Sequence, residues 1–138
     1  MITVFTNGCF DILHRGHIEL LNEAKKLGDK LIVGINSDES IRKLKGNMRP
    51  INLAENRKFL LENLRCVDEV IVFNETTPYK LIRKLKPNIL VKGGDWKKEE
   101  IVGADLVLNN GGEVISLKYI DNYSTTNIIN QIICQQDK

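Results

Sequence analysis

Residues 2–36 read ITVFTNGCFDILHRGHIELLNEAKKLGDKLIVGIN, two apolar runs separated by an amphipathic stretch. The runs at residues 2–5 and 30–35 have the length and composition of short buried strands. Between them, apolar residues recur at helical spacing, which predicts a helix from about Gly16 to Leu27. Gly28 stands where a left-handed residue would end that helix. A strand, a helix and a second strand in this order predict a parallel βαβ unit.

The same alternation continues along the chain. Further strands are expected at residues 68–73, 89–91 and 113–117. Helices are expected at residues 39–44, at 52–64, from Pro78 to a point before Pro87, at 98–109 and from Ser124 onward. Asn52 and Glu55 resemble a capping box at the start of the second of these. Short, nearly continuous apolar strands separated by helices predict a parallel sheet covered on both faces. We therefore expect one doubly wound, Rossmann-like α/β domain over residues 1–138, with five parallel strands in the order 3-2-1-4-5.

Composition excludes several classes of protein. Hydrophobic residues make up 42% and charged residues 28% of the chain, as in proteins that fold around their own core. A net charge of +2 and 6% aromatic residues argue against a nucleic-acid partner. No apolar run approaches the roughly 20 residues that span a bilayer, and no signal peptide precedes the first strand. We therefore expect no membrane partner. The three scattered cysteines suggest neither disulfides nor a zinc knuckle, so we expect a cytoplasmic location.

The two histidines of the chain follow the first strand. His14 and His17 lie three residues apart at a helix start, so both rings face the ends of the strands. Gly16 between them leaves room for a ligand to approach the backbone. With the positive end of the helix dipole, they predict an anion site, most naturally for a phosphate. Two other interpretations stay open: histidines that only cap and pack the helix, and a metal site with Cys9 or Asp11, for which the sequence offers no convincing fourth ligand.

A second anion site is expected near the other end of the chain. The sequence contains neither the dinucleotide-binding motif GxGxxG nor the P-loop motif GxxxxGK[ST]. A phosphate site in this chain therefore uses neither of these loops. Ser124, Thr125 and Thr126 follow the fifth strand and open the last helix with hydroxyls and free backbone N–H groups. Ordinary capping by Ser124 is the alternative. In a sheet of order 3-2-1-4-5, the two helix starts can share one cleft.

Cations and glycines follow the second and fourth strands. Lys45 lies in a loop region after the second strand, and Arg57 lies one turn into the next helix, where a guanidinium can fork onto a second phosphate. A solvated surface is the alternative for both. After the fourth strand, the run Lys92–Asp95 contains two glycines that permit close approach, and Asp95 is a candidate for binding a ribose or a cation.

The segment Gly8–His17 and the run Ser124–Thr126 resemble the HxGH nucleotidyltransferase superfamily. The resemblance is closer to one branch, the adenylyltransferase domains of bacterial ADP-heptose synthases. It rests on the segments Asn36–Asp38, Leu44–Gly46, Arg49–Pro50, Val91–Asp95, Gly111–Val114 and Ser124–Ile129. Two positions depart from the wider superfamily. Asn127 stands where a basic residue is common, and Cys9 stands where cytidylyltransferases commonly have Thr; both agree with the heptose branch.

The resemblance implies an enzyme that transfers AMP from ATP to heptose 1-phosphate, for lipopolysaccharide or related glycan precursors. It implies catalytic roles for His14 and His17, and binding of the substrate phosphate by Lys45 and Arg57. The implied nucleotide-binding residues are Asn7, Gly8, Cys9, Phe10, Asp11, Gly16, Lys92, Asp95, Ser124, Thr125 and Thr126. Mg²⁺ is expected with ATP, with Asp11 as a candidate ligand, and base contacts are expected near Asp95 and Tyr123.

The resemblance also implies a homodimer. No kinase sequence is present in these 138 residues, so we expect a free-standing adenylyltransferase or an excised domain. The alternative of the same class is a cytidylyltransferase acting on glycerol 3-phosphate or a similar polyol phosphate. The alternative of another class is a regulatory nucleotide-binding module without turnover. A broken histidine or hydroxyl motif would indicate that module, and both motifs are intact.

Overall fold

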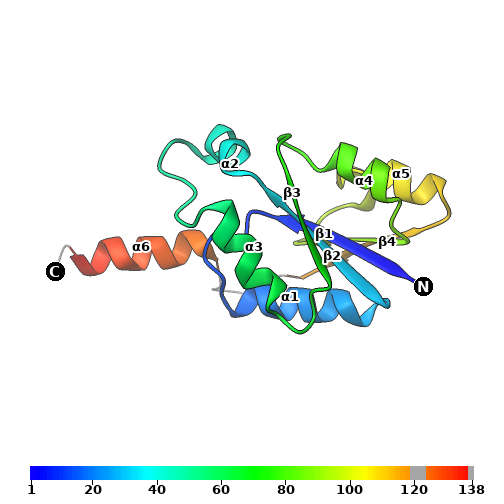
Figure 1. Ribbon diagram of the computed structural model, residues 1–138, viewed down its shortest axis with the longest axis horizontal. Helices are drawn as coiled ribbons and strands as arrows, with labels where there is room; N and C mark the ends of the chain where they lie inside the picture. The colour runs from blue at the N-terminus through cyan, green and yellow to red at the C-terminus, as the bar shows by residue number, and fades with distance from the viewer. Residues whose placement is uncertain (119–123, 137–138) are drawn as a thin grey trace.

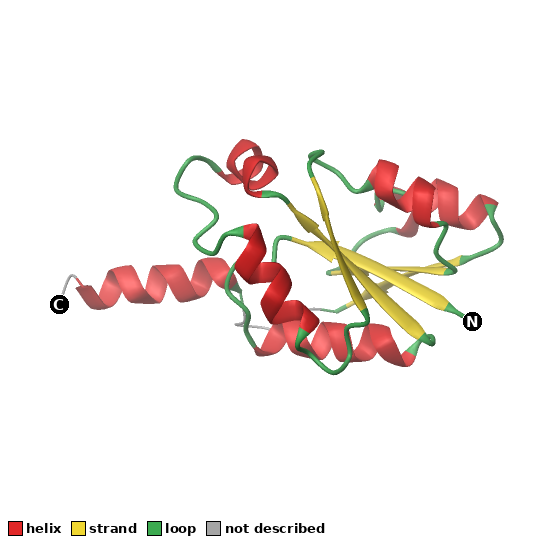
Figure 2. Cartoon of the chain, viewed as in Figure 1, coloured by secondary structure: helices red, strands yellow, loops and turns green. Residues whose placement is uncertain are grey.

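The computed structural model describes residues 1–118 and 124–136, which form a parallel sheet flanked by helices (Figures 1 and 2). The strands are β1 (Thr3–Gly8), β2 (Lys30–Asn36), β3 (Glu69–Phe73), β4 (Ile89–Gly93) and β5 (Glu113–Leu117). The helices are α1 (Arg15–Lys26), α2 (Asp38–Lys45), α3 (Ala54–Glu62), α4 (Tyr79–Leu85), the 3₁₀ turn η1 (Lys98–Glu100), α5 (Ala104–Asn109) and α6 (Thr125–Gln136). The strand order is β3-β2-β1-β4-β5 and every pair is parallel, which confirms the predicted doubly wound fold.

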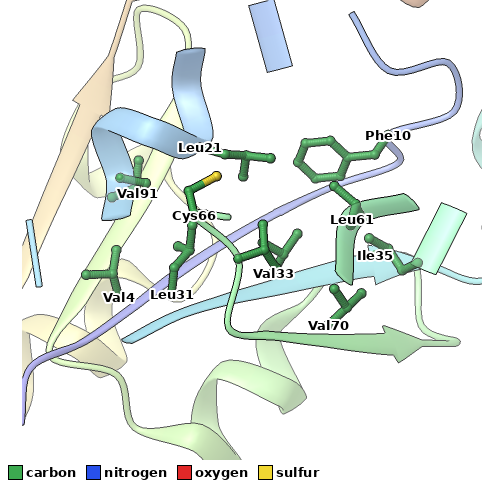
Figure 3. Packing of buried hydrophobic residues seen from close by; sticks show 12 residues of the cluster. Val4, Phe10, Leu21, Leu31, Val33, Ile35, Leu61, Cys66, Val70 and Val91 are labelled. Atoms are coloured by element: carbon green, nitrogen blue, oxygen red, sulfur yellow. The ribbon is translucent and has the colours of Figure 1, made fainter. Parts of the chain in front are cut away.

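Two apolar layers fasten the helices to the sheet. α1 and α3 lie on one face and α4 and α5 lie on the other (Figure 1). Neighbouring residues of a strand point to opposite faces: Val4 packs in a cluster with Leu21 and Leu61 (Figure 3), whereas Phe5 packs in a cluster with Ile82. Burying a side chain of this size stabilises the fold by about 1.5–3 kcal/mol. None of the helices in the described part of the chain is long and apolar enough to cross a membrane.

The helix expected over residues 98–109 is interrupted. Gly103, with φ of +88°, separates η1 from α5. A Cβ atom at this position would lie 2.6 Å from Cδ1 of Ile82, so a side chain there would collide with α4 as well as strain the backbone. Gly103 itself is the sign of this break in the sequence, whereas the contact with Ile82 that excludes a side chain there is visible only in the fold.

Gly28 does not end α1 in the predicted way. α1 ends at Leu27 in the right-handed conformation, and no positive φ occurs at Gly28. A Cβ atom on Gly28 would lie 2.8 Å from the carbonyl oxygen of Ile2. The glycine is therefore required for the close approach of the turn to the first strand, and not for a left-handed cap.

The capping box predicted at Asn52 is also absent. Helix α3 begins after Leu53, and its first N–H, from Ala54, donates to Oδ1 of Asp38 at 2.8 Å. The Asn52 side chain instead donates to the carbonyl oxygen of Asp11 at 2.8 Å. Helix α3 is thus capped from α2, a long-range contact that a local motif cannot indicate. By contrast, α2 is capped locally by Ser37, whose Oγ accepts from the N–H of Ser40 at 3.1 Å.

Candidate functional site

A cavity of about 470 Å³ lies between the starts of α1 and α6, at the carboxyl ends of β1 and β4. It is lined by Asn7, Gly8, Cys9, Phe10, Asp11, His14, Gly16, His17, Leu20, Lys45, Lys92, Gly93 and Ser124–Asn127. We call residues 7–17 the histidine wall and residues 124–127 the hydroxyl wall. The two helix starts share one cleft, as the strand order predicted. Every residue predicted for the site lines this cavity except Asp95 and Arg57.

The two histidines are coupled at the start of α1. His14 precedes the helix, and its backbone N–H donates to Nδ1 of His17 at 3.3 Å. The rings stack with their centroids 3.8 Å apart and their planes 22° apart. Because Nδ1 of His17 accepts a hydrogen bond, the neutral ring carries its proton on Nε2. His17 therefore has a fixed tautomer, with an N–H group left to donate to a ligand.

Both histidines favour the neutral form at neutral pH. Burial lowers the pKa of His14 below its ordinary value. Burial, together with the positive charges of His14 and Lys45, lowers the pKa of His17 to about 4. Neutral imidazoles donate N–H groups without carrying a charge of their own. An anion bound between them would favour protonation and raise both pKa values.

The histidine wall turns sharply at Phe10. Its φ of +49° is unusual for an aromatic residue and costs about 1–2 kcal/mol. The ring is buried and lies 5.0 Å from the His17 ring, centroid to centroid. A Cβ atom on Gly8 would lie 2.9 Å from this ring, so Gly8 makes room for it. Burial of the ring offsets the backbone strain and gives the histidines a packed support.

Asp11 organises the histidine wall from within. Its buried carboxylate accepts from Nε of Arg49 at 2.9 Å and from the backbone N–H groups of Ile51 at 3.0 Å and Asn52 at 2.8 Å. Burial raises the pKa of Asp11, but these donors outweigh it and hold the pKa below its ordinary value. Both carboxylate oxygens are thus occupied by protein donors, and the structure corrects the expectation that Asp11 binds Mg²⁺. No cluster of three or more His, Cys, Asp or Glu suited to a metal occurs in residues 1–118 and 124–136.

Arg57 lies in the first turn of α3, as predicted, but its guanidinium points into the protein. Its side chain is fully buried, and Nη1 donates to the carbonyl oxygens of Cys9 at 2.9 Å and Asn36 at 2.8 Å. Nε donates to the carbonyl oxygen of Asn52 and Nη2 donates to Asp38, both at 2.8 Å. Arg57 therefore joins the ends of β1 and β2 to the start of α3. The structure corrects the expectation that it holds a substrate phosphate, because the guanidinium cannot reach a ligand.

Two lysines do face the cavity. Lys45 lies at the end of α2, and Lys92 comes from β4. Neither forms an ion pair with a carboxylate in the described part of the chain. Burial lowers the pKa of Lys92 below its ordinary value. A half-buried ammonium without a carboxylate partner is well suited to a phosphate, whose negative charge favours the protonated form of the lysine.

The hydroxyl wall is tied to the histidine wall by one side chain. Thr125 Oγ1 donates to the carbonyl oxygen of Ile12 at 3.1 Å and lies 3.4 Å from the Ile12 N–H. Ser124 caps α6, since its Oγ accepts from the N–H of Asn127 at 3.0 Å. The hydroxyl of Thr126 is exposed at the cavity. The run of three hydroxyls therefore divides into a cap, a tether and a group available to a ligand.

A second cavity, of about 340 Å³, adjoins the first and was missed by the sequence analysis. It shares Asn7, Gly8, Cys9 and Lys92 with the first cavity, and is further lined by Asn36, Leu44, Thr76–Pro78, Trp96 and Glu100–Val102. The sequence signals for it are Thr76, Lys92 and Trp96, which lie at or just after the carboxyl ends of the third and fourth strands. Asp95 is exposed in the turn after β4 and lines neither cavity, and Tyr123 lies outside the described residues.

Comparison with known proteins finds relatives over nearly the whole chain. A family model described as cytidylyltransferase-like matches residues 5–131. The bifunctional protein HldE of Hydrogenovibrio crunogenus is 55% identical over 129 residues, which cover 94% of this chain and 27% of that protein. HldE of Escherichia coli O139:H28 is 55% identical over 135 residues, covering 98% of this chain and 28% of that protein. The chain thus spans little more than a quarter of these relatives.

A solved structure has similar size and shape. The lipopolysaccharide core biosynthesis protein of Thermoplasma volcanium GSS1 is 34% identical, with a TM-score of 0.70. The match covers 90% of this chain and 99% of that one.

Proposed function

This chain belongs to the cytidylyltransferase-like family, and on that premise we propose that it transfers AMP from ATP to a sugar 1-phosphate, releasing pyrophosphate. The observation that carries the proposal is the pair of stacked, neutral histidines opposite a hydroxyl-bearing helix start, with two lysines in the same cavity. The resemblance to ADP-heptose synthases and the similarity to a lipopolysaccharide core biosynthesis protein favour heptose 1-phosphate as the acceptor, with ADP-heptose as the product.

The chemistry requires positioning and charge stabilisation and no covalent enzyme intermediate. An oxygen of the sugar phosphate attacks the α-phosphorus of ATP in line, and the bond from that phosphorus to the bridging oxygen of pyrophosphate breaks. His14 and His17 donate hydrogen bonds to oxygens whose negative charge grows in the transition state. Thr126 and the first N–H groups of α6 hold the departing phosphates. Lys45 and Lys92 supply positive charge within the same cavity.

Mg²⁺ enters this proposal as part of the substrate, MgATP. The carboxylate of Asp11 is occupied by Arg49 and two backbone N–H groups, so it has no free oxygen for a metal ion. Phosphate oxygens and water are the usual partners of Mg²⁺ at nucleotide sites. The protein's own contribution is therefore to orient the triphosphate, through its histidines, lysines and hydroxyls.

The test is pyrophosphate release in four combinations, ATP or CTP with heptose 1-phosphate or glycerol 3-phosphate, each with Mg²⁺. We expect release with ATP and heptose 1-phosphate. Release only with CTP and glycerol 3-phosphate would overturn the proposed substrates while keeping the roles of the histidines. Silence in all four combinations, from protein shown to be folded, would contradict the proposed function.

We also propose that the chain acts as a homodimer in the cytoplasm. α6 extends away from the sheet (Figure 1), with Ile132 and Ile133 about half exposed. Phe59 of α3 is a further exposed apolar side chain. Light scattering is expected to give twice the mass of the chain, and the double variant Ile132→Asn, Ile133→Asn is expected to give the mass of one. A monomeric wild-type chain would contradict the dimer and leave the chemistry untouched.

A further inference from the structure

The second cavity begins where the first one ends. Lys92 lines both, so its ammonium group lies at their shared boundary. Trp96, Glu100, Thr76 and Thr77 line the second cavity and not the first. A ligand that spans the boundary would therefore place one end beside the histidines and the other among aromatic, hydroxyl and carboxylate groups.

Trp96 is held in place before any ligand arrives. Its indole Nε1–H donates to the carbonyl oxygen of Gly93 at 3.0 Å, and its backbone N–H donates to Oγ of Ser116 at 3.2 Å. The Ser116 hydroxyl in turn donates to the carbonyl oxygen of Gly94. The side chain is nevertheless 45% exposed, and Nζ of Lys92 lies 6.0 Å from the ring centroid. The result is a fixed aromatic face that is open to a ligand and lies close to a cation.

The lining of this cavity is largely apolar, with Leu44, Pro78, Ile101 and Val102 offering contact to ring carbons, and its few polar groups suit the hydroxyls of a neutral ring. Thr76 and Thr77 are exposed and offer hydroxyls, and Glu100 offers exposed carboxylate oxygens that accept from hydroxyl donors. The negative charge of Glu100 disfavours a phosphate at that end, whereas the positive charge of Lys92 favours one at the boundary. A sugar phosphate satisfies both ends at once, with its phosphate at Lys92 and its ring beyond.

We infer that the second cavity is the acceptor subsite, in which Trp96 stacks against the polyhydroxylated ring of a sugar phosphate and Lys92 holds its phosphate at the boundary with the nucleotide cavity. This inference rests on the proposed function. It reassigns the substrate phosphate from Arg57, which is enclosed by carbonyl oxygens, to Lys92, which faces both cavities. A volume of about 340 Å³ also accommodates a sugar ring, whereas a three-carbon polyol would leave most of the cavity unfilled.

The first test uses a property of the chain itself: Trp96 is its only tryptophan. Fluorescence excited selectively at tryptophan therefore reports on this one position. We expect heptose 1-phosphate, added without ATP, to change the emission in a saturable way, and glycerol 3-phosphate at the same concentration to change it much less. Emission that heptose 1-phosphate leaves unchanged, at concentrations that saturate turnover, would overturn the inference. Because this titration needs no turnover, a positive result stands even if the chemistry differs from the one proposed.

The second test separates the two cavities by kinetics. Trp96→Ala is expected to raise KM for heptose 1-phosphate about three- to tenfold, the usual effect of losing one aromatic stacking partner, while KM for ATP stays within about twofold. Trp96→Tyr, which keeps an aromatic face, is expected to restore most of the loss. The matched control is Leu108→Ala, which removes a similarly exposed apolar side chain of α5 that lines neither cavity.

The outcomes distinguish the inference from the proposed function. If wild-type protein turns over heptose 1-phosphate and Trp96→Ala keeps the wild-type KM for it, the acceptor subsite is wrong and the function stands. Equal effects on both substrates would also overturn the subsite. If wild-type protein turns over no sugar phosphate although heptose 1-phosphate changes the Trp96 emission, the proposed function is wrong and the subsite stands.

Discussion

The two walls of the nucleotide cavity are built in different ways. The histidine wall is held from behind by buried polar groups: Arg57 binds the carbonyl oxygen of Cys9, and Asp11 binds the loop that contains Ile51 and Asn52. The hydroxyl wall begins a helix whose only buried residue among those described is Thr125, and α6 then leaves the body of the molecule (Figure 1). One wall is part of the protein core, and the other rests against it.

We infer from this difference that the histidine wall positions groups for the reaction, whereas the hydroxyl wall binds phosphates. The histidines need a fixed tautomer and direction to stabilise a transition state, and a network of buried hydrogen bonds provides them. The hydroxyl wall needs only to present N–H and hydroxyl donors to phosphates, which a single tether achieves. We therefore expect substitutions behind the histidine wall to cost more stability than substitutions in the hydroxyl wall.

The largest effect is expected from removing the support of the histidine wall. Arg57→Ala removes the cation beside the carboxylate of Asp38 and one donor from each of three carbonyl oxygens, and is expected to lower the free energy of unfolding by about 3–5 kcal/mol. Urea denaturation measures this loss. The control Arg42→Ala removes an exposed arginine of α2 and is expected to change stability by at most about 0.5 kcal/mol.

A loss below about 1 kcal/mol for Arg57→Ala would show that the two walls are equally independent of the core. If Arg57→Ala does not fold, Arg57→Lys provides the measurement. A lysine keeps one charged donor but cannot serve all four acceptors at once, so an intermediate loss of stability is expected.

The second-largest effect is expected on kcat, from replacing a histidine of the histidine wall. His17→Gln is expected to lower kcat about a hundredfold or more, because the shorter-reaching amide cannot both accept the His14 N–H and hold an N–H donor at the position of the imidazole Nε2. Stability is expected to change by at most about 1 kcal/mol, because glutamine at the third position of a helix can accept the His14 N–H as His17 does. Pyrophosphate release and urea denaturation measure the two effects. A kcat within a few-fold of wild type would exclude the proposed role of His17.

A pH effect on stability is expected to come from the same wall. The pKa of His17 is about 4 in the folded protein and near its ordinary value of 6.5 in the unfolded chain. Between these values the unfolded chain binds more protons, so stability falls as the pH decreases from 6.5 to 4, by at most about 3 kcal/mol. His14, whose pKa burial also lowers, acts in the same direction.

Denaturation of wild type and His17→Gln at several pH values checks this expectation. The slope between pH 6.5 and 4 should be clearly smaller in the variant. Asp11 has a lowered carboxylate pKa, so its loss of stability occurs below this range, as the pH falls from 3.8 through its folded pKa. Identical slopes in the two proteins would mean that the His17 ring titrates normally in the folded state.

The smallest effect is expected in the hydroxyl wall. Thr125→Val keeps the shape of the side chain but removes the bond to Ile12, and is expected to cost about 1 kcal/mol of stability. It should also raise KM for ATP a few-fold, because α6 is less well placed. The comparison is Thr126→Val, whose exposed hydroxyl is not part of the tether. That variant should leave stability unchanged within about 0.5 kcal/mol and still weaken ATP binding. A loss of stability in Thr126→Val but not in Thr125→Val would show that Thr126, and not Thr125, forms the tether.

The amino-acid sequence by itself determined the layers of the fold and the two helix starts at the cavity. Periods of apolar residues decide which segments become strands and helices, and these periods are local properties. His14 and His17 meet because the residue before a helix lies beside the third residue of that helix, and Ser124 caps α6 because of its place before that helix. These features are local, so their prediction does not depend on how distant parts of the chain pack.

Only the tertiary structure decided what the charged residues do. Arg57 and Lys92 are both cations near strand ends, yet one is enclosed by carbonyl oxygens and the other faces two cavities. The carboxylate of Asp11 binds the backbone 41 residues along the chain. A charge binds whichever partner the fold brings within about 3 Å, and no period in the sequence encodes that neighbour. Local periodicity therefore predicted the frame of the site, and long-range hydrogen bonding decided which charges remain for a ligand.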